Sequence, residues 1–137
     1  MIWYKTISTP TSGQLPTSKQ LKTLFDSVSW AQTLTKEELK YAIDNSSHII
    51  TAWDNDNLVG LIRSMDDNIY SASIDLLLVK KEYQGQGIGT ALIEKMKENI
   101  KHIKFISVSP DNIKDFKLYQ RCGFVFVNNS GQLQLHN

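Results

Sequence analysis

The sequence lacks the features that define several protein classes. It has a single cysteine, Cys122, which excludes an intrachain disulfide, and its first residues do not show the basic and then apolar pattern of a secretory signal. Its apolar runs, such as Leu76 to Val79, are far shorter than the ~20 residues that cross a bilayer. These absences predict a cytoplasmic protein without a membrane partner.

Charge and metal-ligand patterns are equally sparse. Fifteen basic and fourteen acidic residues give a net charge of +1, and no block of like charges is present to attract a nucleic acid. The three histidines and the cysteine have no metal-ligand spacing, so no metal is expected. The 137 residues fit one domain, residues 1–137, and leave open a homodimer.

Two short amphipathic helices are predicted near the N-terminus. Leu21, Leu24 and Phe25 recur at helical spacing behind Ser18, which we expect to cap the first helix. Thr35 and Glu38 have the spacing of a capping box, and this pattern predicts a second helix after Thr35.

Segments rich in β-forming residues alternate with turn residues through most of the chain. The segment Tyr70 to Val79 ends in an apolar run, which indicates a central strand buried on both faces. One helix is expected after the glycines at 85, 87 and 89, and another, capped by Asp111 or Asn112, reaches Arg121. The other expected strands are Ile2 to Ser8, His48 to Trp53, Leu58 to Met65, Lys104 to Ser109, Phe124 to Val127 and Gln132 to Leu135.

The glycine loop between the central strand and the following helix carries the first functional signal. Backbone amides in such a turn can approach an anion closely, and the helix N-terminus adds about half a positive charge. A Walker loop would need Lys and then Ser or Thr after its last glycine, where this chain has Thr90 and Ala91. A dinucleotide fingerprint would need a glycine at position 90. A phosphate compound of another kind is therefore expected.

The run from Gln84 to Gly89 resembles the Q/R-x-x-G-x-G/A signature of the GNAT superfamily of acyl-CoA-dependent N-acetyltransferases. The resemblance continues through Asn112, through Leu118-Tyr119 and through Gly123-Phe124. It implies an α+β or α/β fold whose mixed, mostly antiparallel sheet splays open after the central strand and is flanked by about four helices. It also implies acetyl-CoA as the acyl donor, without a metal.

The same resemblance assigns the residues that bind acetyl-CoA. The pantetheine arm would pair with the backbone of Leu77 to Val79, and the pyrophosphate would lie on the amides of Gln84 to Thr90. The implied set is Leu77, Leu78, Val79, Gln84, Gly85, Gln86, Gly87, Ile88, Gly89, Thr90, Asn112 and Tyr119.

Three positions depart from the family pattern. Lys81 stands where proline is common, and Gln84 and Gln86 replace the more common basic residues. Backbone amides would then supply more of the phosphate contact. Lys80 and Lys81 are candidates to compensate, although lysines near a strand end are usually only solvated.

Acetyl transfer to an amine needs a proton donor for the thiolate, a donor for the oxyanion and a base. Tyr119 occupies the family's general-acid position, and a phenol with a pKa near ~10 is protonated at neutral pH. The oxyanion donor implied by the resemblance is the backbone amide of Val79 or Leu78. Ser73 stands near the position of a glutamate in some relatives, which leaves Asp75 as the nearest carboxylate on that strand.

The remaining candidates are weaker. Asp75 is equally compatible with a structural hydrogen-bonding role, His48 is a less favoured base, and a base acting through water is a further alternative. Cys122 is rejected as a nucleophile because cysteines next to a helix C-terminus are usually inert and no histidine partner is evident.

The acceptor expected from these patterns is the primary amine of a small molecule, which would attack the acetyl group of acetyl-CoA directly. The N-terminal helices that would form the acceptor wall are short, and Trp30 and Tyr41 are candidates to line it. Two alternatives are a protein or peptide N-acetyltransferase and a non-catalytic acyl-CoA-binding regulatory module.

Overall fold

The computed structural model of the chain describes residues 1–8, 15–28, 34–110, 112–126 and 133–136. Its strands are β1 (Ile2–Ser8), β2 (His48–Asp54), β3 (Asn57–Asp66), β4 (Ser71–Val79), β5 (Phe105–Val108), β6 (Val125–Phe126) and β7 (Leu133–His136). Its α-helices are α1 (Ser18–Asp26), α2 (Lys36–Asp44), α3 (Ile88–Asn99) and α4 (Ile113–Arg121).

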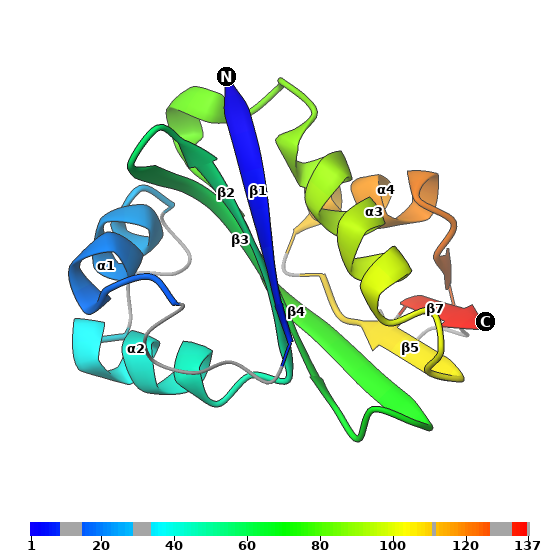
Figure 1. Cartoon of the computed structure of the whole chain (residues 1–137). Helices are drawn as coiled ribbons and strands as arrows, with labels where there is room; N and C mark the ends of the chain where they lie inside the picture. Colours follow the sequence, from blue (N-terminus) through cyan, green and yellow to red (C-terminus); the bar gives the residue numbers. More distant parts are fainter. Residues whose placement is uncertain (9–14, 29–33, 111, 127–132, 137) are drawn as a thin grey trace.

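The strands form one sheet in the order β1-β2-β3-β4-β5-β7-β6. The pair β4 and β5 is parallel and the other neighbouring strands are antiparallel. Helices α1 and α2 lie on one face of the sheet, and α3 and α4 lie on the other (Figure 1). This arrangement confirms the mixed, mostly antiparallel sheet with β4 at its centre.

Side-chain caps lie at the N-termini of three helices, α1, α2 and α4. The hydroxyl of Thr17 accepts a hydrogen bond from the backbone amide of Gln20, and the Gln20 side-chain oxygen accepts one from the backbone amide of Thr17. Thr17, rather than the predicted Ser18, therefore caps α1. The capping box of Thr35 and Glu38 is confirmed at α2. Such a cap is worth about 1 kcal/mol.

The C-terminal strands pair as a hairpin, but β7 rather than β6 lies beside β5. Gly123 follows α4 with φ of +96°, as expected at a helix C-terminus. Two candidates named from the sequence, Trp30 and Asp111, lie outside the described residues.

Two apolar clusters hold the layers together. One joins α3 and α4 to the sheet and includes Ile74, Leu92, Met96 and Val108. The other joins α1 and α2 to the opposite face and includes Leu24, Ile43 and Leu61. None of the helices in the described residues has the length and apolar content needed to cross a membrane.

The central pair of strands stays together for only half of β4. The parallel register runs from Ser71 opposite Phe105 to Ile74 opposite Val108, where β5 ends. On the other side of β4, the register with β3 shifts between Leu61 and Arg63, and Leu76 adopts φ of +54°. This bulge lies just beyond the last residue paired with β5, so β4 continues past the pair as the predicted splay.

Candidate functional site

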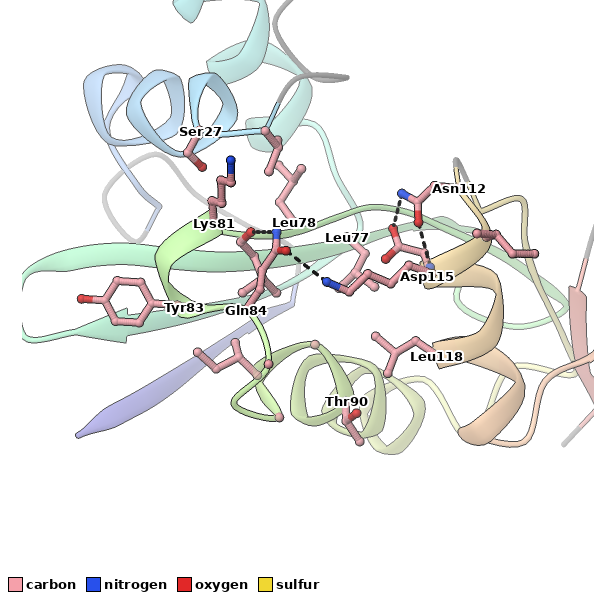
Figure 2. Close-up of a pocket in the computed structure, with 18 of the residues that line it drawn as sticks. Ser27, Leu77, Leu78, Lys81, Tyr83, Gln84, Thr90, Asn112, Asp115 and Leu118 are labelled. Atoms are coloured by element: carbon pink, nitrogen blue, oxygen red, sulfur yellow. Dashed lines mark hydrogen bonds between the residues drawn. The ribbon is translucent and has the colours of Figure 1, made fainter.

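A pocket of about 800 Å³ lies where β4 continues beyond β5, between the end of that strand, the first turn of α3 and one side of α4 (Figure 2). The predicted acetyl-CoA-binding residues line this pocket, with the exceptions of Gln86 and Tyr119. Ser27 and Val28, at the end of α1, also reach it. The end of α1, residues 77–90 and the start of α4 are thus brought together from three separate parts of the chain.

The N-terminus of α3 presents backbone amides to this pocket. Its N-cap is Gly87, which has no side chain to accept from them, whereas Thr17, Thr35 and Asn112 cap the other three α-helices that the structure describes. Gly85 and Gly87 adopt φ of +82° and +84°, and a Cβ added at either would meet nothing within 4 Å. The loop therefore leaves open space beside the positive end of a helix, as an anion site requires.

Gly89, unlike Gly85 and Gly87, is required for helix packing. A Cβ at this position would come within 2.9 Å of Leu118 Cδ2 on α4. The absence of a side chain lets α3 and α4 pack closely on the same side of the pocket. Gly89 thus shapes the wall, while Gly85 and Gly87 shape the loop.

A short 3-10 helix, Lys81–Tyr83, leads from β4 into the loop and was not predicted. The Tyr83 hydroxyl donates to Asp54 Oδ2 at 2.6 Å, which ties the loop to the end of β2. This hydrogen bond to a carboxylate is the main cause that raises the pKa of Tyr83 above its usual value. The anchored hydroxyl fixes where the glycine loop begins.

The charged side chains that line the pocket are mostly basic. They are Lys81, Lys114 and Arg121, against the single carboxylate of Asp115. Lys114, Leu118 and Arg121 are spaced by four and then three residues, so they share one face of α4. None of these three residues was predicted as a site residue, because their spacing indicates a shared helix face but only the folded chain brings that face to the pocket.

Tyr119 lies next to the pocket rather than on its surface. Its side chain is 1% exposed and belongs to the same apolar cluster as Ile74, Leu77 and Val108, which border the splay. The ring packs edge to face on Phe124, with 5.2 Å between the centroids. The predicted general acid is therefore a buried ring of the cluster that packs α3 and α4 on the sheet.

Asp75 lies on the face of the sheet that carries α1 and α2. Arg63 grips its carboxylate with two hydrogen bonds, from Nε to Oδ1 at 2.6 Å and from Nη2 to Oδ2 at 3.2 Å. The Asp75 side chain is 45% exposed and does not line the pocket. Asp75 thus has the ion pair that is typical of a structural carboxylate, but its side chain is also accessible to solvent. It directly follows Ile74, the last β4 residue paired with β5.

Cys122 is buried at the end of α4. Burial, together with a contact to Glu94, raises the pKa of its thiol to about 11. The thiol is therefore protonated at neutral pH, which argues against a role as a nucleophile.

His48 lies at the other end of β2, in a polar pocket. Its Nδ1 contacts the hydroxyl of Ser8 at 2.9 Å, and its Nε2 lies 3.4 Å from Asp66 Oδ2. Opposite His48 on β3 is Ser64, which lies four residues, or ~13 Å, along the strand from Gly60, the partner of Val79 at the pocket end of β4. His48 is thus separated from the candidate site.

Other sequence candidates are distributed as follows. Tyr41 lies on α2 and is 73% exposed, so it is not a core aromatic residue. Within the described ranges, no group of three or more His, Cys, Asp or Glu side chains is arranged to hold a metal ion.

Comparison with known proteins agrees with this geometry. Residues 15–134 match the family model described as an acetyltransferase (GNAT) domain. The chain is 29% identical over 114 residues to the uncharacterized N-acetyltransferase ycf52 of Pyropia yezoensis, covering 77% of this chain and 63% of that protein. It is 41% identical over 70 residues to GCN5-related N-acetyltransferase 2, chloroplastic, of Arabidopsis thaliana, covering 49% of this chain and 26% of that protein.

A solved structure extends the match to nearly the whole fold. The GNAT family acetyltransferase from Streptococcus pneumoniae TIGR4 superposes with a TM-score of 0.73 at 27% identity, covering 95% of this chain and all of that one. The chain spans less than two thirds of the length of the two curated relatives named above. The family match, the splayed sheet and the glycine loop at the start of α3 lead to one conclusion: the chain belongs to the GNAT acetyltransferase family.

Proposed function

We propose that this protein transfers an acetyl group from acetyl-CoA to the primary amine of a small molecule by direct attack. The observation that carries the proposal is the glycine loop at the uncapped N-terminus of α3, which lines a pocket together with the end of β4 that extends beyond β5. A helix N-terminus with open glycines suits a pyrophosphate, and the edge of β4 that extends beyond β5 suits the amides of a pantetheine arm. The loop amides, Asn112 and residues 77–79 of β4 would hold acetyl-CoA.

The thioester supplies an activated acetyl group, and residues of the chain move the protons. The amine nitrogen forms a bond to the carbonyl carbon while the carbon–sulfur bond breaks. A backbone amide of Leu78 or Val79 stabilises the charge that develops on the carbonyl oxygen. Tyr119 donates its proton to the departing sulfur, and Asp75 accepts a proton from the amine.

The preference for a small acceptor rests on the N-terminal helices. Helices α1 and α2 have nine residues each and pack against the sheet through buried leucines and isoleucines. Among the described residues, the segment between them adds no further element that would form a peptide-binding wall. The exposed Tyr41 is a candidate contact for the acceptor on this side.

A panel of acceptors tests the reaction. We expect thiol release from acetyl-CoA in the presence of at least one polyamine, amino sugar or arylalkylamine, and none with lysine peptides or peptide N-termini. Turnover with peptides alone would replace the small acceptor by a protein substrate. Binding of acetyl-CoA without turnover of any amine would favour a regulatory acyl-CoA-binding module.

Gly87→Asp tests the loop, because it adds a negative charge where the pyrophosphate would approach. We expect acetyl-CoA binding to be lost in calorimetry. Two controls measure the effect of backbone strain without a charge. Gly87→Ala adds only a methyl group in open space at the same positive φ, and Gly123→Ala adds one at φ of +96° after α4. Equal affinity in the wild type and Gly87→Asp would remove the loop from the site.

Tyr119→Phe tests the proton donor, since it keeps the packed ring and deletes the hydroxyl. We expect acetyl-CoA affinity to stay within about twofold while kcat falls by up to ~10²- to 10⁴-fold, as for loss of a general acid. The effect is smaller if the thiolate, with a pKa near ~8.5, leaves unaided. Unchanged turnover from pH 6 to 9 in a folded variant would make Tyr119 a packing residue.

Asp75→Asn tests the base while preserving the size of the side chain. We expect kcat to fall by ~10²-fold or more and the acid limb of the pH–rate profile to disappear. Arg63→Gln is the matched control, because it breaks the same ion pair but keeps the carboxylate. If both variants lose the same stability and neither loses activity, the pair is structural and the base is water or another group.

A further inference from the structure

Gln84 bridges the two sides of the pocket. Its side-chain Nε2 donates to the carbonyl of Val79 at 2.9 Å, and its Oε1 accepts from the ammonium of Lys114 at 3.1 Å (Figure 2). Val79 ends β4, and Lys114 lies in the first turn of α4. A neutral side chain of the glycine loop therefore holds a cation that comes from a distant part of the sequence.

Lys114 brings a positive charge to Gln84, the uncharged first residue of the glycine loop. Gln84 is the first residue of the loop, and residues 84–90 include no charged side chain. The bond to a neutral amide leaves the charge of Lys114 available to an anion. Of the other charged groups lining the pocket, the carboxylate of Asp115 accepts from Asn112 Nδ2 at 3.3 Å, and the Asp115 backbone amide donates to the side-chain oxygen of the same capping residue.

The Gln84 side chain also occupies the backbone carbonyl of Val79, which acetyl-CoA would need as a hydrogen-bond acceptor. If the pantetheine arm pairs with the end of β4, an amide of that arm competes with Gln84 for the Val79 carbonyl. Displacement of the Gln84 side chain would free Lys114 at the same time. Both partners of Gln84 are thus released by a single event, on the side of the pocket where Gly85 and Gly87 leave open space.

We propose that Lys114 is the cation that pairs with the pyrophosphate of acetyl-CoA, and that Gln84 holds it in place until the donor binds. This inference rests on the proposed function and adds a residue that determines donor affinity. Lys114 supplies the positive charge that the side chains of residues 84–90 lack. Gln84 acts as a temporary partner for both Val79 and Lys114 rather than as a phosphate ligand.

The test compares Lys114→Gln with Lys117→Gln, an exposed lysine on the same helix that does not line the pocket. Calorimetry with CoA and with 3′-dephospho-CoA should show about tenfold weaker binding for Lys114→Gln with both compounds and wild-type affinity for Lys117→Gln. Added salt should weaken wild-type binding more than that of Lys114→Gln. Acetyl-pantetheine, which has no phosphate, should bind equally to both variants.

Each other outcome has a defined meaning. Loss restricted to CoA, with normal binding of 3′-dephospho-CoA, would overturn the assignment in favour of the 3′-phosphate. Equal affinities in all variants, or a loss that includes acetyl-pantetheine, would also overturn it. Gln84→Ala should bind CoA at least as tightly as the wild type, and a tenfold loss would make Gln84 itself the ligand. Failure of the wild type to bind CoA would instead refute the proposed function.

Discussion

The early end of pairing between β4 and β5 is the constraint on which the site depends. Backbone groups that leave a sheet must find other partners, because unpaired polar groups are costly to bury. Here β4 continues for five residues beyond Ile74, its last residue paired with β5, and the bulge at Leu76 lies within this stretch. The open edge of β4 and the α3 N-terminus, which has no side-chain cap, then face the same pocket, so two sets of backbone groups contribute to one site.

The bulge is stabilised by packing on both sides of the sheet. A leucine at φ of +54° costs about 1–2 kcal/mol relative to an extended conformation. Leu77 is buried in the cluster beneath α3 and α4, whereas Leu76 and Leu78 pack with the cluster beneath α1 and α2. Burial of a leucine contributes about 1.5–3 kcal/mol. The two clusters therefore offset the strain at a position that has no glycine to relieve it.

Features with a local physical cause could be predicted from the sequence, and features that depend on distant contacts could not. The Thr35 capping box, the β2–β3 hairpin and the glycine turn follow from side chains a few residues apart. The bulge could not be predicted, because nothing in an isolated leucine favours a positive φ. Lys114 was missed because only the folded chain brings it to Gln84. Asp75 and Tyr119 were found as candidates, but their roles stay predictions, because an ion pair and a buried ring are compatible with both structural and chemical tasks.

The ion pair at Asp75 also connects α2 to strands β3 and β4. Arg63 donates to the carbonyl of Ala42 near the C-terminus of α2, where a positive charge is favoured, while its other nitrogens hold Asp75. Asp75 directly precedes the bulge, and Leu77 and Val79 beyond it line the pocket on the opposite face. A shift of α2 must therefore either break the contacts of Arg63 or move the strand that forms the pocket. The helix on the side of the expected acceptor and the strand on the side of the expected donor are thus both bound by the guanidinium group of Arg63.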